Sequence, residues 1–184
     1  RRDPKIERPH NVFAHLREIR MLAENARWDP QNTADFFNFD GGPTPQIRDA
    51  ETAPAVTLDF SFPQYKSRFE YDAGMAAYKR FLGGTPHRDS LTDAQLIAHN
   101  IIIQFADYWP VDEVGRLQFR NVGEGKALLF RDGAMVRGTW KKSDKNSRTE
   151  FFDEVGEPFV LKPGQTWIEV INDVKRVRIE NILE

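Results

Sequence analysis

The sequence contains no cysteine among its 184 residues, which excludes disulfide bonds, a thiolate nucleophile, cysteine-ligated zinc and iron–sulfur clusters. No apolar run approaches 18 residues, so no segment is predicted to span a bilayer as a helix. The net charge is only −2, and a chain this close to neutral has no general attraction to nucleic acid or anionic lipid. With 40% hydrophobic and 12% aromatic residues, the chain has enough apolar material for one large domain or two small ones.

One amphipathic helix is predicted near the start, over residues 11–27. Apolar residues recur there at intervals of three and four, which is the spacing of one helical face: Phe13, Leu16, Ile19 and Ala23. Asn11 is a favourable N-cap, and Pro30 disfavours helix at the residue before it. We therefore expect Asn11 to have a structural, capping role.

A linker over residues 40–54, rich in glycine and proline, separates this helix from a β-rich part. Residues 56–62 alternate between apolar and polar side chains, and Asp132-Gly133 is a strong hairpin turn. The predicted fold class is α+β, mainly antiparallel β-sheet with one N-terminal helix. The expected domains are residues 1–50 and 55–184. One core is expected to contain the apolar residues of these strands: Leu58, Phe60, Ile102, Leu128, Phe130, Val160 and Ile168.

Short motifs in the β-rich part resemble a known family. They are Asn100-Ile-Ile-Ile-Gln104, Val122-Gly-Glu-Gly125, Phe130-Arg-Asp-Gly133, Gly138-Thr-Trp140 and Pro163-Gly-Gln-Thr-Trp167. Their pattern is similar to the C-terminal domain of the YerB-like lipoprotein family, a domain of unknown function. The resemblance implies an extracytoplasmic bacterial lipoprotein, membrane-anchored through a lipid on a part that precedes this sequence. It also implies that residues 1–50 are the tail of an upstream N-terminal domain. The resemblance implies no particular catalysed reaction.

A group of polar residues follows the linker, and it is the candidate ligand site: Arg68, Tyr71, Tyr78, Arg80, His87, Asp89 and Asn100. Arginine presents a fork of donors to carboxylates and phosphates, and tyrosine adds a flat face with a hydroxyl tip. Such a group would suit an anionic or sugar-like ligand. The alternative is that the arginines and tyrosines pair across a sheet and that Asn100 satisfies backbone groups of a turn. Because side chains three apart on a strand face opposite sides, Arg68 and Tyr71 share a surface only if a bulge intervenes.

Other clusters have weaker signals. His87 and Asp89 resemble a base with an orienting carboxylate, but no Gly-x-Ser-x-Gly nucleophile motif accompanies them, and Asp89 is equally a turn former. His10, His15 and Glu18 lack the second pair of ligands that a helical metal site uses. The basic stretch 137–148 is typical of a solvated hairpin tip as well as of a polyanion site.

The functional expectation is a binding or interaction module of the bacterial cell envelope. Its partner would be an envelope glycan, peptide or protein, with no nucleic acid, no cofactor and no metal, and with the membrane reached only through the lipid anchor. The alternative is an envelope hydrolase or transferase that uses His87 and Asp89 together with the arginine and tyrosine group. The absence of nucleophile, metal and cofactor motifs favours the binding module.

Overall fold

The computed structural model describes residues 4–5, 14–27, 38–39 and 50–180. The chain divides into two compact units, residues 1–36 and 37–184, and each is described by itself. The first contains α1 (Leu16–Asn25), which begins later than predicted, with His15 at the N-cap position and no side-chain capping bond. Asn11 lies outside the described residues, but the prediction that it caps this helix is wrong, because the N-cap position belongs to His15. The apolar face of α1 is exposed, with Leu16 85% and Leu22 66% accessible.

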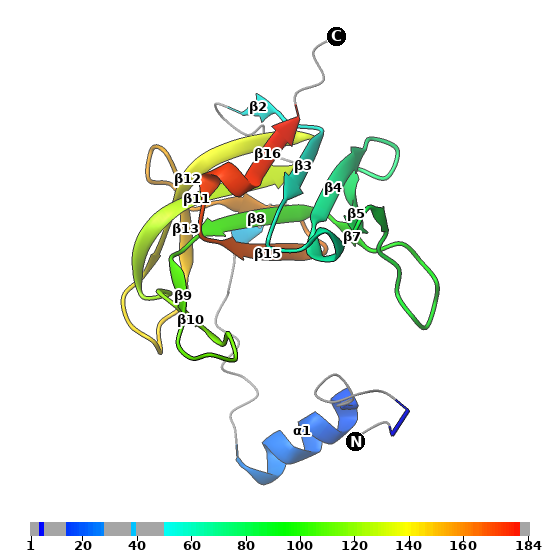
Figure 1. Ribbon diagram of the computed structural model, residues 1–184, viewed down its shortest axis with the longest axis vertical. Coiled ribbons are helices and arrows are strands. Elements are labelled where there is room, and N and C mark those ends of the chain that lie inside the picture. Colours follow the sequence, from blue (N-terminus) through cyan, green and yellow to red (C-terminus); the bar gives the residue numbers. More distant parts are fainter. Residues whose placement is uncertain (1–3, 6–13, 28–37, 40–49, 181–184) are drawn as a thin grey trace. The chain divides into compact units, whose positions relative to one another are not determined.

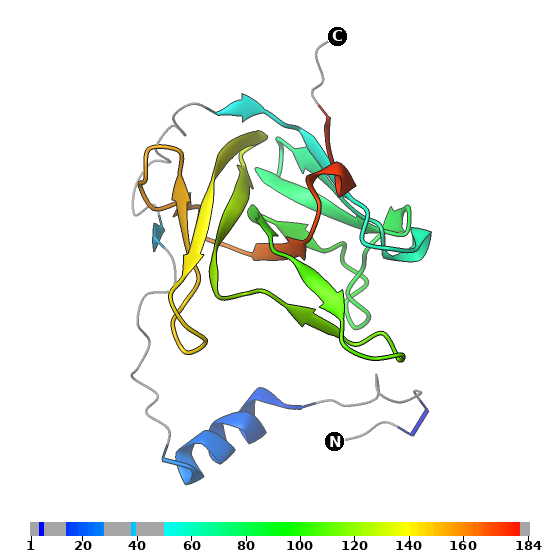
Figure 2. The same cartoon turned by 60° about the vertical axis from the view of Figure 1, so that its left-hand side comes forward.

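The second unit is built from two six-stranded sheets. The sheet that we call the long sheet contains β2 (Glu51–Thr52), β8 (Asn100–Phe105), β11 (Gly123–Arg131), β12 (Ala134–Lys142), β13 (Glu150–Asp153) and β15 (Thr166–Ile171). The short sheet contains β3 (Ala55–Leu58), β4 (Ser67–Asp72), β5 (Ala77–Leu82), β6 (Thr85–Pro86), β7 (Ile97–Ala98) and β16 (Val177–Glu180). Figures 1 and 2 show the short sheet packed across one face of the long sheet. The α+β prediction, mainly antiparallel with an N-terminal helix, is confirmed.

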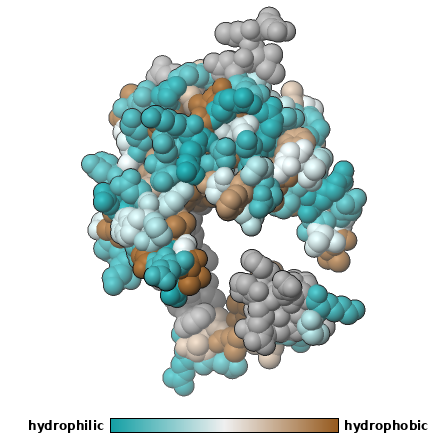
Figure 3. All heavy atoms as spheres, viewed as in Figure 1, coloured by the Kyte–Doolittle hydropathy of each residue, from teal (hydrophilic) through white to brown (hydrophobic). Residues whose placement is uncertain are grey.

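Two small strand pairs complete the unit. β1 (Asn38–Phe39) pairs in parallel with β14 (Val160–Leu161), and β9 (Tyr108–Pro110) pairs antiparallel with β10 (Leu117–Phe119). Two 3-10 turns, η1 (Pro63–Tyr65) and η2 (Val174–Arg176), precede β4 and β16. Figure 3 shows hydrophobic side chains among polar ones at the β9–β10 hairpin, whose loop residue Val114 is 85% accessible.

The apolar residues form two clusters rather than the one core expected. Between the sheets lie Leu58, Phe69, Ile101, Ile103, Leu128 and Phe130 with their neighbours. The other face of the long sheet carries the second cluster, which includes Ile102, Leu129, Trp140, Phe151 and Leu161. β8 is buried on both faces, which explains its run of three isoleucines.

Four of the seven predicted core residues are buried, two are partly buried and one is exposed. Phe60 and Val160 are only partly buried, and Ile168 is 43% exposed. The prediction for Ile168 is wrong because β15 is the last strand of the long sheet. On β15, Trp167 packs against the cluster between the sheets. Because neighbouring side chains of a strand point to opposite faces, Ile168 lies on the other face of the long sheet, outside the second cluster.

The β11–β12 hairpin has the geometry that its sequence predicts. Asp132 and Gly133 both have positive φ angles, 52° and 74°, as a two-residue turn between twisted strands requires. Farther along β12, a Cβ on Gly138 would stand 1.9 Å from the carbonyl oxygen of Phe152. Only glycine lets β13 approach this closely, so the bend of the long sheet depends on that position.

Candidate functional site

Arg80 lies between the two sheets, where it is only 6% exposed. Its Nη2 donates to Ser67 Oγ at 2.9 Å and to Glu169 Oε1 at 3.4 Å, and its guanidinium lies 4.3 Å from the Trp167 ring centroid. Its Nη1 is hydrogen-bonded to Nδ1 of His87. Because a guanidinium can only donate, His87 is neutral with Nδ1 as the acceptor. Arg80 therefore joins β5 of one sheet to β15 of the other.

Burial is the main cause of the pKa shifts of both titratable neighbours of Arg80. Burial and the positive charge of Arg80 lower the pKa of His87 below its ordinary 6.5. Burial raises the pKa of Glu169 above its ordinary 4.5, and the attraction of Arg80 only partly offsets that effect. Desolvation thus outweighs the ion pair, which is consistent with the long distance between the two groups.

Arg68 lies on the opposite face of the short sheet. It donates to Glu70 at 2.6 Å and to both oxygens of Glu180 at 2.5 and 2.8 Å. Arg80 stands opposite Phe69 in the β4–β5 register, so it shares the inner face with Phe69 and not the outer face with Arg68. The hydrogen bonds from Arg68 lower the pKa of Glu180.

The remaining members of the predicted group have local partners. Tyr78 is buried, donates its hydroxyl to the carbonyl of Ala53 at 3.2 Å, and lies 5.2 Å from the ring of Tyr71. Asp89 accepts from the amides of Leu91 and Thr92 in its own turn, and these bonds lower its pKa.

The side chains of Asn100 and Asp89 both form hydrogen bonds with backbone groups. The Asn100 side chain accepts from Lys162 N–H at 2.8 Å and donates to Lys162 C=O at 2.7 Å, which holds the turn before β15. The Asp89 carboxylate turns toward its own loop, whereas the His87 ring faces Arg80, so the two do not form a base and orienter pair.

The expectation that the seven residues share one surface is therefore wrong. β4 and β5 form a regular ladder from Ser67 to Leu82 without the bulge that a shared surface needs, so alternation divides the group between two faces. Arg80 and His87 do lie together, but the Arg80 guanidinium is hydrogen-bonded to the His87 ring. A ligand-binding role for any of the seven stays a prediction.

The described residues form a groove of about 780 Å³ that the sequence analysis did not identify. β11 and β12 supply one wall, the β13–β14 turn supplies the end, and β16 with η2 supplies the other wall (Figures 1 and 2). The apolar lining comes from both sheets, and it consists of Phe105, Ala127, Leu128, Val174, Val177 and Ile179. This volume is within the usual range for small-ligand sites.

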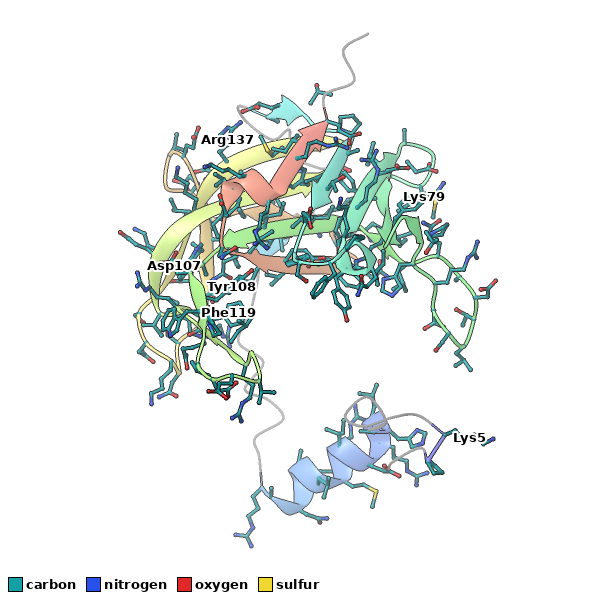
Figure 4. All side chains as sticks on the ribbon, viewed as in Figure 1. Lys5, Lys79, Asp107, Tyr108, Phe119 and Arg137 are labelled. Atoms are coloured by element: carbon teal, nitrogen blue, oxygen red, sulfur yellow. The ribbon has the colours of Figure 1, made fainter. Side chains whose placement is uncertain are left out.

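Charged groups of both signs stand around this apolar lining. Arg137, labelled in Figure 4, donates to both carboxylate oxygens of Glu51 at 2.8 and 3.1 Å, and these bonds lower the pKa of Glu51. Asp153 accepts from two amides of its own turn. Lys126 and Glu154 are exposed, and within the described ranges neither makes a hydrogen bond or ion pair. The charge of Glu154 does act on Arg137, whose pKa it helps to raise. The groove thus offers one cation and one carboxylate that make no direct contact with a partner among the described residues.

One sequence signal pointed toward this wall. Lys126 and Leu128 alternate on β11, and Arg137 and Thr139 stand opposite them on β12, so the hairpin has one mixed polar and apolar face. The opposite wall comes from β16, far along the chain, and no local pattern predicts that it crosses there. Among the described residues, no group of three histidine and acidic side chains is placed to hold a metal ion. No helix in those ranges has the length and apolar character of a membrane span.

Comparisons with known proteins address the family and the fold. The crystal structure of the YerB protein from Bacillus subtilis is similar with a TM-score of 0.78 and 23% sequence identity. The match covers 98% of this chain and 59% of that one, so this chain spans about three fifths of its length, and the likeness concerns the fold. No curated protein matches the chain. The family model described as the C-terminal domain of a protein of unknown function, DUF3048, matches residues 56–168. The chain therefore belongs to the DUF3048 family.

Proposed function

We propose that the chain is a binding module of the bacterial cell envelope, working outside the cytoplasmic membrane. Its ligand is a short peptide, or the peptide part of an envelope polymer, that carries both an anionic and a cationic group. The observation that carries this proposal is the groove between the β11–β12 hairpin and β16, with its apolar lining and its free charges. The extracytoplasmic location rests on the family resemblance.

The chemistry of the groove favours a peptide over a uniformly anionic polymer. Lys126 on β11 can pair with a carboxylate. Glu154 on the β13–β14 turn, which attracts Arg137 through its charge but makes no direct contact with a cation among the described residues, can pair with an amine. The apolar floor, with Leu128 only 8% exposed, suits an aliphatic or aromatic side chain between those two groups. A polyanion would meet Glu154 as well as Lys126, and like charges in contact are unfavourable.

Titration of the ¹⁵N-labelled chain with short peptides tests the proposal. We expect uncapped tripeptides of net charge zero to shift the amide resonances of β11, β12 and β16. The same peptides with acetylated and amidated ends should bind more weakly, because they cannot pair with Lys126 and Glu154. Shifts confined to other strands, or equal binding of capped and uncapped peptides, would contradict the proposal.

A matched pair of charge reversals locates the site. Lys126→Glu should weaken binding about tenfold or more, which corresponds to roughly 1.4 kcal/mol. Lys145→Glu makes the same change of charge in the β12–β13 loop, away from the groove lining, and should leave the affinity unchanged. A large effect of both variants would indicate long-range electrostatics rather than a contact in the groove.

A further inference from the structure

Within the part of the chain that the structure describes, β15 is a six-residue strand that pairs on one side only. It runs parallel to β8 from Thr166 to Ile171 and ends the strand order of the long sheet. The edge contains no proline and no bulge, and Ile168 at its centre is 43% exposed. Proteins usually protect an edge of this length, because it is a template for another strand.

The hydrogen-bonding direction of each β15 residue follows from two bonds to β8. The carbonyl of Gln165 accepts from Asn100 N–H, and the carbonyl of Ile171 accepts from Ala106 N–H. Backbone groups on a strand alternate between its two edges, so the odd-numbered residues face β8. The N–H and C=O groups of Thr166, Ile168 and Val170 therefore point to the free edge.

The other described edges of the two sheets are shorter or covered. β13, at the far edge of the long sheet, is bonded by the segment that follows it, through Phe159 N–H to Phe151 C=O and Asp153 N–H to Glu157 C=O. In the short sheet, β16 has four residues, and β6 and β7 have two each. Within the described ranges, β15 is the longest strand with an open edge.

We propose that β15 is a self-association edge, on which a second copy of this chain pairs antiparallel through its own β15. With the two-fold axis at Ile168, the Ile168 N–H and C=O groups bond to their counterparts in the copy. Thr166 then faces Val170 of the copy, so each outward backbone group of the three residues finds a partner. The two Ile168 side chains meet on one face, where each covers the other's exposed surface.

Charge on the strand does not oppose this pairing. Glu169 is the charged residue of β15, and its carboxylate faces inward, where Arg80 accompanies it. Gln165 and Asn172, which flank the strand, are uncharged. A single strand pair buries less than the roughly 1,200–2,000 Å² of a standard interface, so the dimer is weak and concentration-dependent. β15 does not line the groove, so this inference is independent of the proposed function.

Sedimentation velocity on the full chain tests the association. From about 10 μM to about 1 mM, we expect the apparent mass to rise from that of a monomer toward twice that value. Ile168→Lys should keep the chain monomeric over the range, because two lysines would meet at the axis. Val114→Lys is the matched control, since Val114 is 85% exposed on the β9–β10 hairpin, and this variant should associate like the wild type.

Amide hydrogen exchange on the wild-type chain provides a readout that needs no variant. The amides of Thr166, Ile168 and Val170 should exchange rapidly in dilute protein and at least about tenfold more slowly in concentrated protein. The amides of Trp167 and Glu169 face β8 and should be protected at both concentrations. A monomer at every concentration, association that survives Ile168→Lys but not Val114→Lys, or exchange independent of concentration would overturn the proposal.

Discussion

Replacing Arg80 by methionine tests whether this buried cation joins the two sheets. Methionine retains much of the length of the side chain but neither its charge nor its donors. The change leaves Glu169, whose side chain is 12% exposed, as a buried carboxylate without its cation. Breaking a buried pair by removing one partner costs about 3–5 kcal/mol. We expect about 3 kcal/mol, because the pair is long at 3.4 Å and burial already raises the pKa of its carboxyl group.

The sign of the pH dependence sharpens this prediction. The pKa of Glu169 in the folded protein is raised above its ordinary 4.5, so the folded state holds this proton more tightly than the unfolded state. Such a group destabilises the fold at high pH, and stability returns as the pH falls through its folded pKa. Without Arg80 that pKa rises further. The loss in Arg80→Met should therefore be larger at neutral pH than at about pH 5.

A double-mutant cycle by urea unfolding measures the coupling. Glu169→Gln alone should lower the free energy of unfolding less than Arg80→Met, because Arg80 retains its contacts with Ser67, His87 and the ring of Trp167. Adding Glu169→Gln to Arg80→Met should recover part of the loss. A loss below about 1 kcal/mol for Arg80→Met, or additivity within about 0.5 kcal/mol, would refute the argument.

Three further predictions follow from buried or perturbed groups. Phe130→Ala should lower the free energy of unfolding by about 3–5 kcal/mol in urea titrations, because Phe130 is 0% exposed between the sheets. Asn100→Ala should cost about 1–3 kcal/mol by the same measurement, since it strands the Lys162 N–H and C=O that Asn100 satisfies. His87→Gln should lose less stability than the wild type as the pH falls below about 6.5, because the folded state of the wild type resists protonating His87 in that window, where its pKa is lowered.

Much of the fold was predictable from local patterns. The alternation of residues 56–62 places Leu58 in the core, although β3 ends at Leu58 and Phe62 is exposed. The Asp132-Gly133 turn connects two nine-residue strands. The three isoleucines of β8 form an uninterrupted apolar run, which is typical of a strand covered on both faces, and the two clusters supply that cover. The position of a strand within its sheet was not predictable. Ile168 was therefore misassigned, because only the sheet order shows that β15 is an edge.

The expectation that the seven polar residues share one surface was wrong for a different physical reason. The arginines and tyrosines of this group are close in sequence: Arg68, Tyr71, Tyr78 and Arg80. In a regular hairpin, however, successive side chains of each strand point to opposite faces of the sheet. Arg68 then meets Glu180, a residue at the far end of the chain that no local pattern places there. Arg80 is buried and contacts residues of both sheets, instead of facing solvent as a ligand contact would. Its replacement is therefore expected to destabilise the free protein.

Charged side chains with an ion-pair partner differ from those without one, and this difference indicates where binding should be sought in this molecule. Arg68, Arg80, Arg137 and Lys162 each meet a carboxylate, so their charges already contribute to the folded state. Lys126 has no such partner among the described residues, although it stands beside a buried leucine in a groove large enough for a ligand. An exposed lysine by itself predicts nothing. Beside an apolar groove, with Glu154 on the adjoining turn also without a direct cationic contact among the described residues, it marks the surface where the proposed ligand should be sought first.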